Sequence, residues 1–155
     1  MVKNKQDALN LYNSLDKLGD LTGVKFAYGI SKNINILKPE VDALQEASKP
    51  SDEFTAYEKL REELLKKHAK KDKDDKPVIV DNSYVLADQK GFDVGFKKIQ
   101  KEHKKAIDDR QAQVDEVEKL LKEKVEVKLH MIKTEDVPEN ISTAQFHSIS
   151  DLIED

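Results

Sequence analysis

The four histidines are the residues of this chain best suited to metal binding or acid–base chemistry. Two of them, His68 and His103, fall on the apolar faces of predicted helices, so they would face one another if those helices paired antiparallel. Acidic candidates for a further ligand are Glu62, Glu63, Asp108 and Asp109. Because acidic residues occur all along the chain, that neighbourhood is not specific to a metal site. We interpret both histidines as half-buried polar residues and expect no metal.

A short acidic run superficially resembles a calcium-binding loop. It contains Asp72, Asp74 and Asp75 at nearly alternate positions. A calcium loop needs Gly at its sixth position and Glu at its twelfth, but counting from Asp72 these positions hold Pro77 and Ser83. We therefore interpret the run as a solvated turn.

Sequence motifs of other catalytic chemistries are absent. The chain has no cysteine, which excludes disulfides and thiolate chemistry, and it has no phosphate loop, dinucleotide fingerprint or nucleophile elbow. Its serines occur at turns and caps, where backbone hydrogen bonding explains them. We expect neither catalytic residues nor a cofactor, although an enzyme whose site has no motif stays open as a third hypothesis.

Charge composition disfavours nucleic acid as a partner. The 27 basic and 31 acidic residues are interleaved and give a net charge of -4. A basic cluster consists of Lys97, Lys98, Lys101, Lys104 and Lys105. Glu102 interrupts it, whereas binding to a phosphate backbone needs a continuous basic face. We interpret the cluster as a solvated helix face.

The remaining composition predicts a protein that folds in water. Charged and hydrophobic residues each make up 37% of the 155 residues, and no run approaches the roughly 20 apolar residues that span a bilayer. The first seven residues lack the apolar core of a signal peptide. We expect no membrane partner and a soluble protein that lies inside a cell or in a particle assembled there.

Helical periodicity dominates the first part of the chain. Apolar residues at three- and four-residue steps predict helices from about 5 to 18, capped by Asn4, and from about 24 to 48. Within the second helix, Gly29 should weaken the backbone and Pro39 should kink or split it. A third helix follows over 51–71.

Strand signals occur at two places. Short β-type runs flank the turn-forming residues 81–83, which predicts a small hairpin within 77–86. Residues 125–131 alternate between apolar and polar side chains, which predicts a half-buried strand. After it, Ser142 and Gln145 fit a capping box, and a final short helix would present Phe146, Ile149, Leu152 and Ile153.

The longest predicted helix, from 92 to about 122, carries the candidate protein-interaction surface. Its heptad-spaced face is apolar at both ends and polar in the middle. The residues assigned to the interaction are Phe92, Phe96, Ile99, His103, Arg110 and Val117. A polar stretch inside such a face indicates where a partner or a second copy would bind.

Together these elements predict one α+β domain, mainly α, over residues 1–155. Residues 51–123 would form a long antiparallel helical hairpin with a β-type tip at 77–90. The short N- and C-terminal helices would form a compact base from residues 1–48 and 124–155.

The order of four sequence strings carries a resemblance. The strings are VKFAYGISKNI at 24–34, YEKLREEL at 57–64, VEVKLHMIK at 125–133 and ISTAQF at 141–146. From about residue 20 onward the chain resembles small uncharacterised proteins encoded by tailed bacteriophages and prophages. The resemblance implies a phage origin and a location in the host cytoplasm or in a virion, and it supplies no activity or functional residues.

We expect a non-enzymatic phage protein that binds protein or assists assembly, is associated with the virion or its assembly, and forms a homo-oligomer. The alternative is a small phage regulator that binds and inhibits a host or defence protein. Particles purified from infected cells would contain an assembly component and would lack a regulator.

Overall fold

The chain is mainly helical with two small pairs of strands, and is therefore α+β with helices dominant. The computed structural model describes residues 2–155. Two compact units divide the chain: unit 1 contains the residues up to Ser48 together with Asp115–Asp155, and unit 2 is Lys49–Val114. Helix α5 (Lys104–Lys122) therefore contributes its first part to unit 2 and its last part to unit 1.

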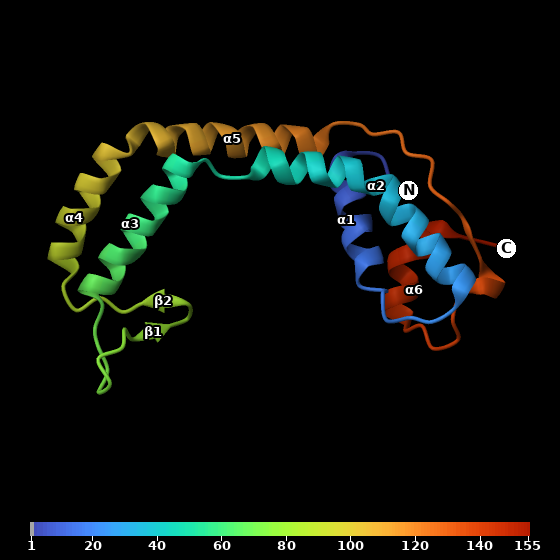
Figure 1. Cartoon of the computed structure of the whole chain (residues 1–155), viewed down its shortest axis with the longest axis horizontal. Helices are drawn as coiled ribbons and strands as arrows, with labels where there is room; N and C mark the ends of the chain where they lie inside the picture. The colour runs from blue at the N-terminus through green and yellow to red at the C-terminus, as the bar shows by residue number, and fades with distance from the viewer. Residues whose placement is uncertain (1) are drawn as a thin grey trace. The chain divides into compact units, whose positions relative to one another are not determined.

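Two helices build most of unit 1. Helix α1 (Lys5–Asp16) packs against α2 (Val24–Ser48), as Figure 1 shows. The predicted cap of α1 is confirmed, since the side chain of Asn4 accepts a 2.8 Å hydrogen bond from the backbone N–H of Asp7. A cap satisfies one of the N–H groups that have no partner within the helix.

Helix α2 runs unbroken through Pro39, so the expected split is wrong. The side chain of Pro39 is exposed, whereas Leu37 and Val41 on either side of it are buried. Packing of these flanking residues keeps the helix continuous despite the missing backbone N–H.

The core of unit 1 joins both ends of the chain. Its buried residues come from α1, α2 and the C-terminal segment, and are Ala8, Leu15, Leu18, Phe26, Ile30, Leu37, Ile132, Ile149 and Leu152. The capping box of α6 (Thr143–Ile149) is present as predicted. Leu152 and Ile153 lie beyond that helix, in the 3₁₀ turn η2 (Ser150–Leu152) and in β4 (Ile153–Glu154).

The predicted strand over 125–131 is wrong. The strands of unit 1 are β3 (Ile132–Lys133) and β4, which pair in parallel, and the turn η1 (Thr134–Asp136) follows β3. A strand is stabilised by hydrogen bonds to a neighbouring strand, and the neighbour of β3 is β4, close to the C-terminal end of the sequence. Residues 125–131 are fastened instead by a bridge between Asn4 and Lys124 and by two hydrogen bonds from Asn33 to the backbone of His130.

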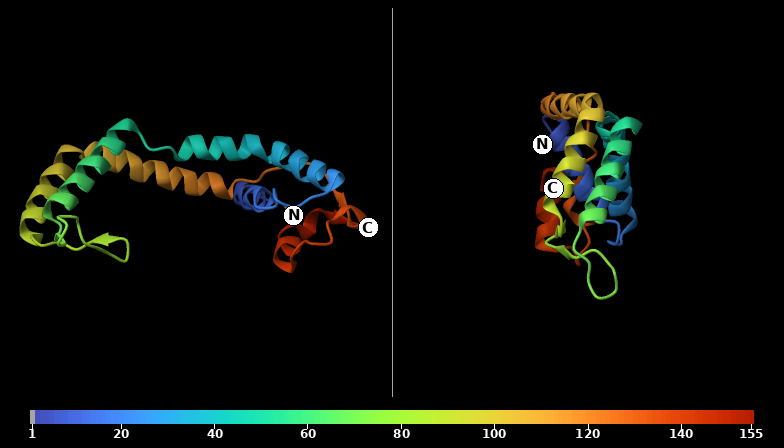
Figure 2. Two further views of the ribbon diagram at one scale, coloured as in Figure 1. Left: turned by 60° about the horizontal axis from the view of Figure 1, so that its bottom comes forward. Right: turned by 90° about the vertical axis from the view of Figure 1, so that its left-hand side faces the viewer.

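Unit 2 is a pair of helices closed by a hairpin. Helices α3 (Asp52–His68) and α4 (Gln89–Glu102) lie side by side in both Figure 1 and Figure 2. Their caps are Ser51 and Asp88. At Gly95 an added Cβ would lie 2.8 Å from the side chain of Leu64, so this glycine permits the close approach of the two helices.

The hairpin at the end of this pair confirms the predicted turn. Strands β1 (Ile79–Val80) and β2 (Ser83–Tyr84) pair antiparallel around Asp81 and Asn82. Both turn residues have positive φ, 48° and 59°. Asp and Asn tolerate this conformation better than most residues, and two such residues form the turn that suits a tight hairpin.

The long helix predicted over 92–122 is divided. It begins earlier, at Gln89, and is interrupted at His103, where φ and ψ are −106° and 18°. Helix α5 starts at the next residue. The interruption lies where the predicted apolar face turns polar.

Candidate functional site

The six predicted interaction residues are all half-buried. Phe92, Phe96 and Ile99 lie on α4, His103 lies at the break between the helices, and Arg110 and Val117 lie on α5. Neither helix has a fully buried residue. The six side chains of the predicted face are therefore each partly exposed to solvent, and none of them is fully buried.

The polar middle of this face contacts α3. The ring of His103 lies 6.1 Å from that of Tyr57, and the guanidinium of Arg110 lies 5.7 Å from the ring of Phe54. Phe92 and Phe96 stack on one another at 5.4 Å. Sequence reasoning assigned the polar stretch to a partner, whereas part of it contacts the chain's own third helix.

His68 and His103 do not face one another. His68 ends α3 beside the start of α4, and its Nδ1 lies 3.0 Å from Oδ2 of Asp88. His103 follows the other end of α4, near Tyr57. In an antiparallel pair, the end of one helix meets the start of the other, which separates the two histidines. Both are half-buried, as their interpretation as polar residues on a helix face predicted.

Asp88 joins the cap of α4 to the end of α3. Its Oδ1 accepts a 2.9 Å hydrogen bond from the N–H of Gly91, and its Oδ2 contacts His68. The hydrogen bond from Gly91, reinforced by His68, lowers the pKa of the Asp88 carboxyl below its usual range. The ionised carboxylate therefore stabilises the junction of the two helices.

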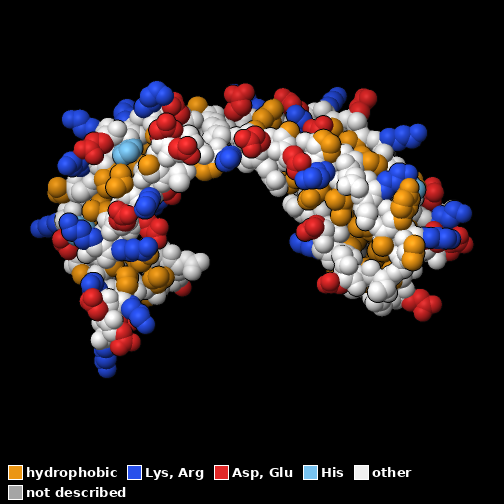
Figure 3. All heavy atoms as spheres, viewed as in Figure 1, with side chains coloured by type: hydrophobic (Ala, Val, Ile, Leu, Met, Phe, Trp, Pro, Cys, Tyr) orange, Lys and Arg blue, Asp and Glu red, His pale blue; other side chains and the backbone are white. Residues whose placement is uncertain are grey.

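Three of the five lysines in the cluster on α4 and α5 form ion pairs along their own helices. Lys98, Lys104 and Lys105 each pair with an acidic residue four positions later. Figure 3 shows basic and acidic side chains interspersed on the exposed surface.

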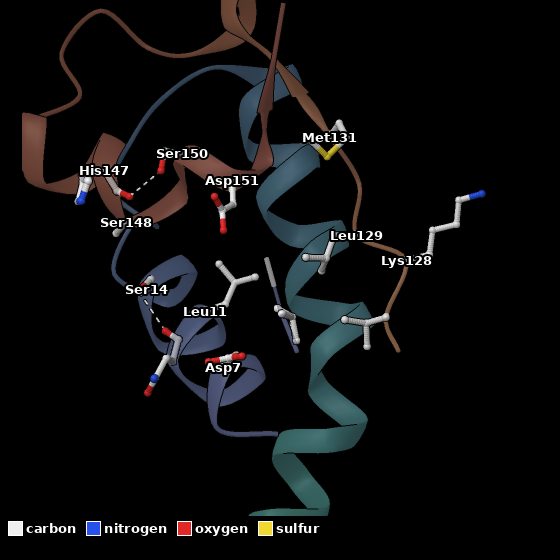
Figure 4. Close-up of a pocket in the computed structure, with 13 residues that line it drawn as sticks. Asp7, Leu11, Ser14, Lys128, Leu129, Met131, His147, Ser148, Ser150 and Asp151 are labelled. Carbon is white, nitrogen blue, oxygen red and sulfur yellow. Dashed lines mark hydrogen bonds between the residues drawn. The ribbon is translucent and has the colours of Figure 1, made fainter. Parts of the chain in front are cut away.

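A groove in unit 1 was not foreseen from the sequence. It has a volume of about 840 Å³ and lies between α1, the end of α6 and residues 127–131. Leu11 and Leu129 lie on the cavity, whereas the side chain of Lys128 points away from it (Figure 4). The alternation of apolar and polar residues over 125–131 was the one sequence signal for this groove, because it indicated that one face of the segment is turned towards the inside of the protein.

Serine, histidine and aspartate side chains also line the groove, and these residue types can form nucleophilic sites. The hydroxyl of Ser14 donates to the backbone carbonyl of Asn10, and that of Ser150 donates to the carbonyl of His147 (Figure 4). Each of these serines thus donates its proton to a carbonyl of its own turn. This is ordinary helix-end hydrogen bonding.

Among residues 2–155, no group of three or more histidine and acidic side chains is placed to hold a metal ion. In the same residues, no helix combines the length and the apolar character required to cross a membrane.

These features describe a helical pair with a partly covered face in unit 2 and a groove of mixed polar and apolar lining in unit 1. Comparison of the chain with models of protein families, with curated proteins and with solved structures finds no match.

Proposed function

We propose that this protein is a non-enzymatic binding or assembly protein that associates with itself or with another phage or host protein through the helices of unit 2. The phage setting rests on the sequence resemblance alone. In finer detail, α3, α4 and the start of α5 would act as a helical hairpin, supported by the compact base of unit 1.

The observation that carries the proposal is the thin core of unit 2. Within Lys49–Val114, the buried apolar residues are Tyr57 and Ala69. Ordering a chain costs about 1–2 kcal/mol per residue in backbone entropy, and burial of apolar surface is the main contribution that offsets this cost. A partner that covers the half-buried side of α4 and α5 would supply the missing burial.

The total exposed surface supports the same conclusion. The chain exposes 11140 Å². Two separate compact domains with the sizes of unit 1 and unit 2 would together expose about 9,600 Å². The surplus surface is the kind that association removes from water.

Sedimentation equilibrium of the full chain tests the self-associating form of the proposal. We expect an oligomer whose mass falls towards that of the monomer in Ile99→Asp, because this change places a charge in the most apolar part of the half-buried face. Val94→Asp is the matched control, since Val94 lies on the same helix with 73% of its surface exposed. Circular dichroism of each variant separates dissociation from loss of helix.

A monomeric wild-type chain with unchanged behaviour in Ile99→Asp would remove the case for self-association through this face. If Val94→Asp dissociates the oligomer and Ile99→Asp leaves its mass unchanged, the interface lies on another face of α4.

Mass spectrometry of purified phage particles tests the biological role. An assembly component should appear in the particles, or in assembly intermediates, at a defined copy number. If the protein is missing from both and a pull-down recovers one host protein, and Ile99→Asp abolishes that recovery, the regulator becomes the correct reading.

A further inference from the structure

Three lysines and one exposed apolar residue form a stripe along α4. Lys90, Val94, Lys97 and Lys101 follow one another at steps of four, three and four residues, which places them on one face of the helix. All four are exposed, and Val94 has 73% of its surface in solvent. The stripe lies wholly within unit 2 and is about 16 Å long, at a rise of about 1.5 Å per residue.

The lysine stripe and the half-buried side of α4 are different faces of the same helix. At about 3.6 residues per turn, Val94 lies about 140° around the helix axis from Ile99. Gly95, whose backbone approaches Leu64 of α3, is half-buried like Ile99. The lysine stripe is therefore the face of α4 that packing against α3 leaves exposed.

The charges of the lysine stripe are not balanced by acidic residues. Among the described residues 2–155, no ion pair is formed by Lys90, Lys97 or Lys101, whereas Lys98 on the same helix pairs with Glu102. The four lysines and two acidic residues of α4 give this helix a net charge of +2, although the whole chain has -4. Figure 3 shows basic side chains projecting from the side of unit 2 on which α4 lies. This face is therefore complementary in charge to an acidic surface.

The stability of α4 does not explain these residues. Lys90 lies in the first turn, where the helix dipole disfavours a positive charge. Val94 is β-branched, which lowers helix propensity, and its exposed side chain gains little from burial. Residues that disagree with local preference without a packing gain are expected at functional surfaces.

We propose that the lysine stripe of α4 binds an acidic amphipathic helix of a partner protein, which lies antiparallel along it. An apolar side chain of that helix would cover Val94, and three carboxylates would pair with the lysines. In the partner's own order the pattern is acidic, acidic, apolar and acidic at relative positions 0, 4, 7 and 11, the reverse of the stripe. The antiparallel direction sets the positive N-terminal end of the partner helix beside the negative end of α4.

A helix fits this face better than a nucleic acid does. Val94 stands between the lysines and offers no aromatic ring on which a base could stack. Three cations also displace few counterions from a phosphate backbone. A helix would instead cover Val94 and add apolar burial to a unit whose buried apolar residues are Tyr57 and Ala69.

A second copy of this chain does not provide the complete pattern. Among the helices of the described residues, none has an apolar residue with acidic residues at all three of these spacings, in either direction. The nearest match is on α3, where Leu60 lies between Glu53 and Glu63. Ala56 and Tyr57 stand there where the remaining acidic residue is needed. The partner is therefore a different protein.

This proposal does not rest on the association proposed above, because that association uses the half-buried side of α4 and α5. Ile99→Asp changes the half-buried side and Lys97→Glu changes the lysine stripe, so the failure of one proposal is distinguishable from the failure of the other.

Selection from a displayed library of helical peptides against the full chain provides the probe. The peptides are alanine-rich and about 20 residues long, which is enough to form a helix, and four positions at the spacing of the stripe are randomised. The expected enriched peptides carry acidic, acidic, aliphatic and acidic residues at these positions. No enrichment above a well without protein, or enrichment of another pattern, would overturn the proposal.

Charge reversal on the stripe tests the recognition. Lys97→Glu should weaken binding of the best selected peptide about tenfold, because it places like charges opposite one another. Lys98→Glu is the matched control, since it makes the same charge change at the next residue, outside the stripe, and should leave the affinity within about threefold. A peptide with lysine in place of the acidic residue that faces Lys97 should bind Lys97→Glu and not the wild-type chain. Equal losses in the two variants, or no restored binding, would contradict the proposed register.

Val94→Ala tests the apolar contact. It should weaken peptide binding about fivefold, because it removes part of the apolar surface that the partner covers, while alanine favours the helix. An unchanged affinity would contradict that contact. Circular dichroism checks that every variant folds. If Lys97→Glu loses helix, Lys97→Gln removes the charge alone and should weaken binding about threefold.

Two further measurements test the other occupants. If a single-stranded oligothymidylate binds more tightly than the selected peptides and Lys97→Glu abolishes that binding, the surface recognises nucleic acid and the proposed partner is wrong. If the wild-type chain self-associates and Lys97→Glu dissociates the oligomer while Ile99→Asp does not, the occupant is a second copy and the proposed partner is again wrong.

Discussion

The side-chain amide of Asn33 forms two hydrogen bonds with the backbone of His130, 97 residues further along the chain. Nδ2 donates to the carbonyl at 2.8 Å, and Oδ1 accepts from the N–H at 2.7 Å. Asn33 is the buried polar residue of the described core. Its amide thus acts as a one-residue strand neighbour and fastens residues 125–131 to α2.

Replacement of Asn33 by Leu should destabilise the protein by about 2–4 kcal/mol, because it leaves two backbone groups without their partner. Urea unfolding followed by circular dichroism measures the change. Asn35→Leu is the control, since Asn35 is exposed on the same helix. Equal effects of the two variants would show that the amide contributes no specific stabilisation.

Gly29→Ala should destabilise the protein by about 1–3 kcal/mol, although alanine favours helices more than glycine does. An added Cβ would lie 2.8 Å from Cγ1 of Ile132, so α2 could no longer approach β3 as closely. Gly19→Ala is the matched control, because the nearest atom to its added Cβ is 3.6 Å away. Thermal unfolding of both variants gives the comparison, and a stabilising effect of Gly29→Ala would disprove the close contact.

Pro39→Ala should stabilise the protein by about 1–3 kcal/mol, because it restores a backbone donor within a continuous helix. Pro50→Ala provides the control, since Pro50 precedes the cap of α3 and lies outside any helix. Chemical unfolding measures both. A loss of stability in Pro39→Ala would mean that the proline has a role that helix continuity does not describe.

Acid should weaken the junction of α3 and α4 through Asp88. Its pKa is lower in the folded chain than in the unfolded one, so the stabilisation is fully present above the ordinary carboxyl pKa and is lost as the pH falls through the folded value. Asp88→Asn should therefore lower the unfolding temperature at about pH 6 and lose its effect at about pH 2.

Asp74→Asn is the control for that titration, because it removes the same charge from an exposed residue of the turn before β1. An equal effect of Asp88→Asn at both ends of the pH range would show that the ionised carboxylate is not what stabilises the junction.

Local sequence patterns determined the helices and their caps. Asn4 and Ser142 cap helices where predicted, because a cap depends only on residues within one turn. The hairpin turn at Asp81 and Asn82 was predictable for the same reason.

Predictions that depended on distant neighbours were wrong or incomplete. Alternation predicted a strand over 125–131, but β3 pairs with β4 across more than a dozen residues, and sequence spacing does not identify such a partner. Periodicity also predicted one long helix, whereas its interruption at His103 follows from what the two halves contact. His68 meets Asp88 instead of His103, because the antiparallel pairing of α3 and α4 decides which ends lie together.

The sequence by itself determined that this chain forms charged, amphipathic helices, because helical periodicity and capping act over a few residues. The tertiary structure decided that residues 125–131 form no strand and line a groove instead. That outcome depends on Asn33 and residues 3–5, which bond the two ends of the segment. Which strand pairs with which depends on residues far apart in the sequence. For this reason residues 125–131 do not form the strand that their alternation predicts.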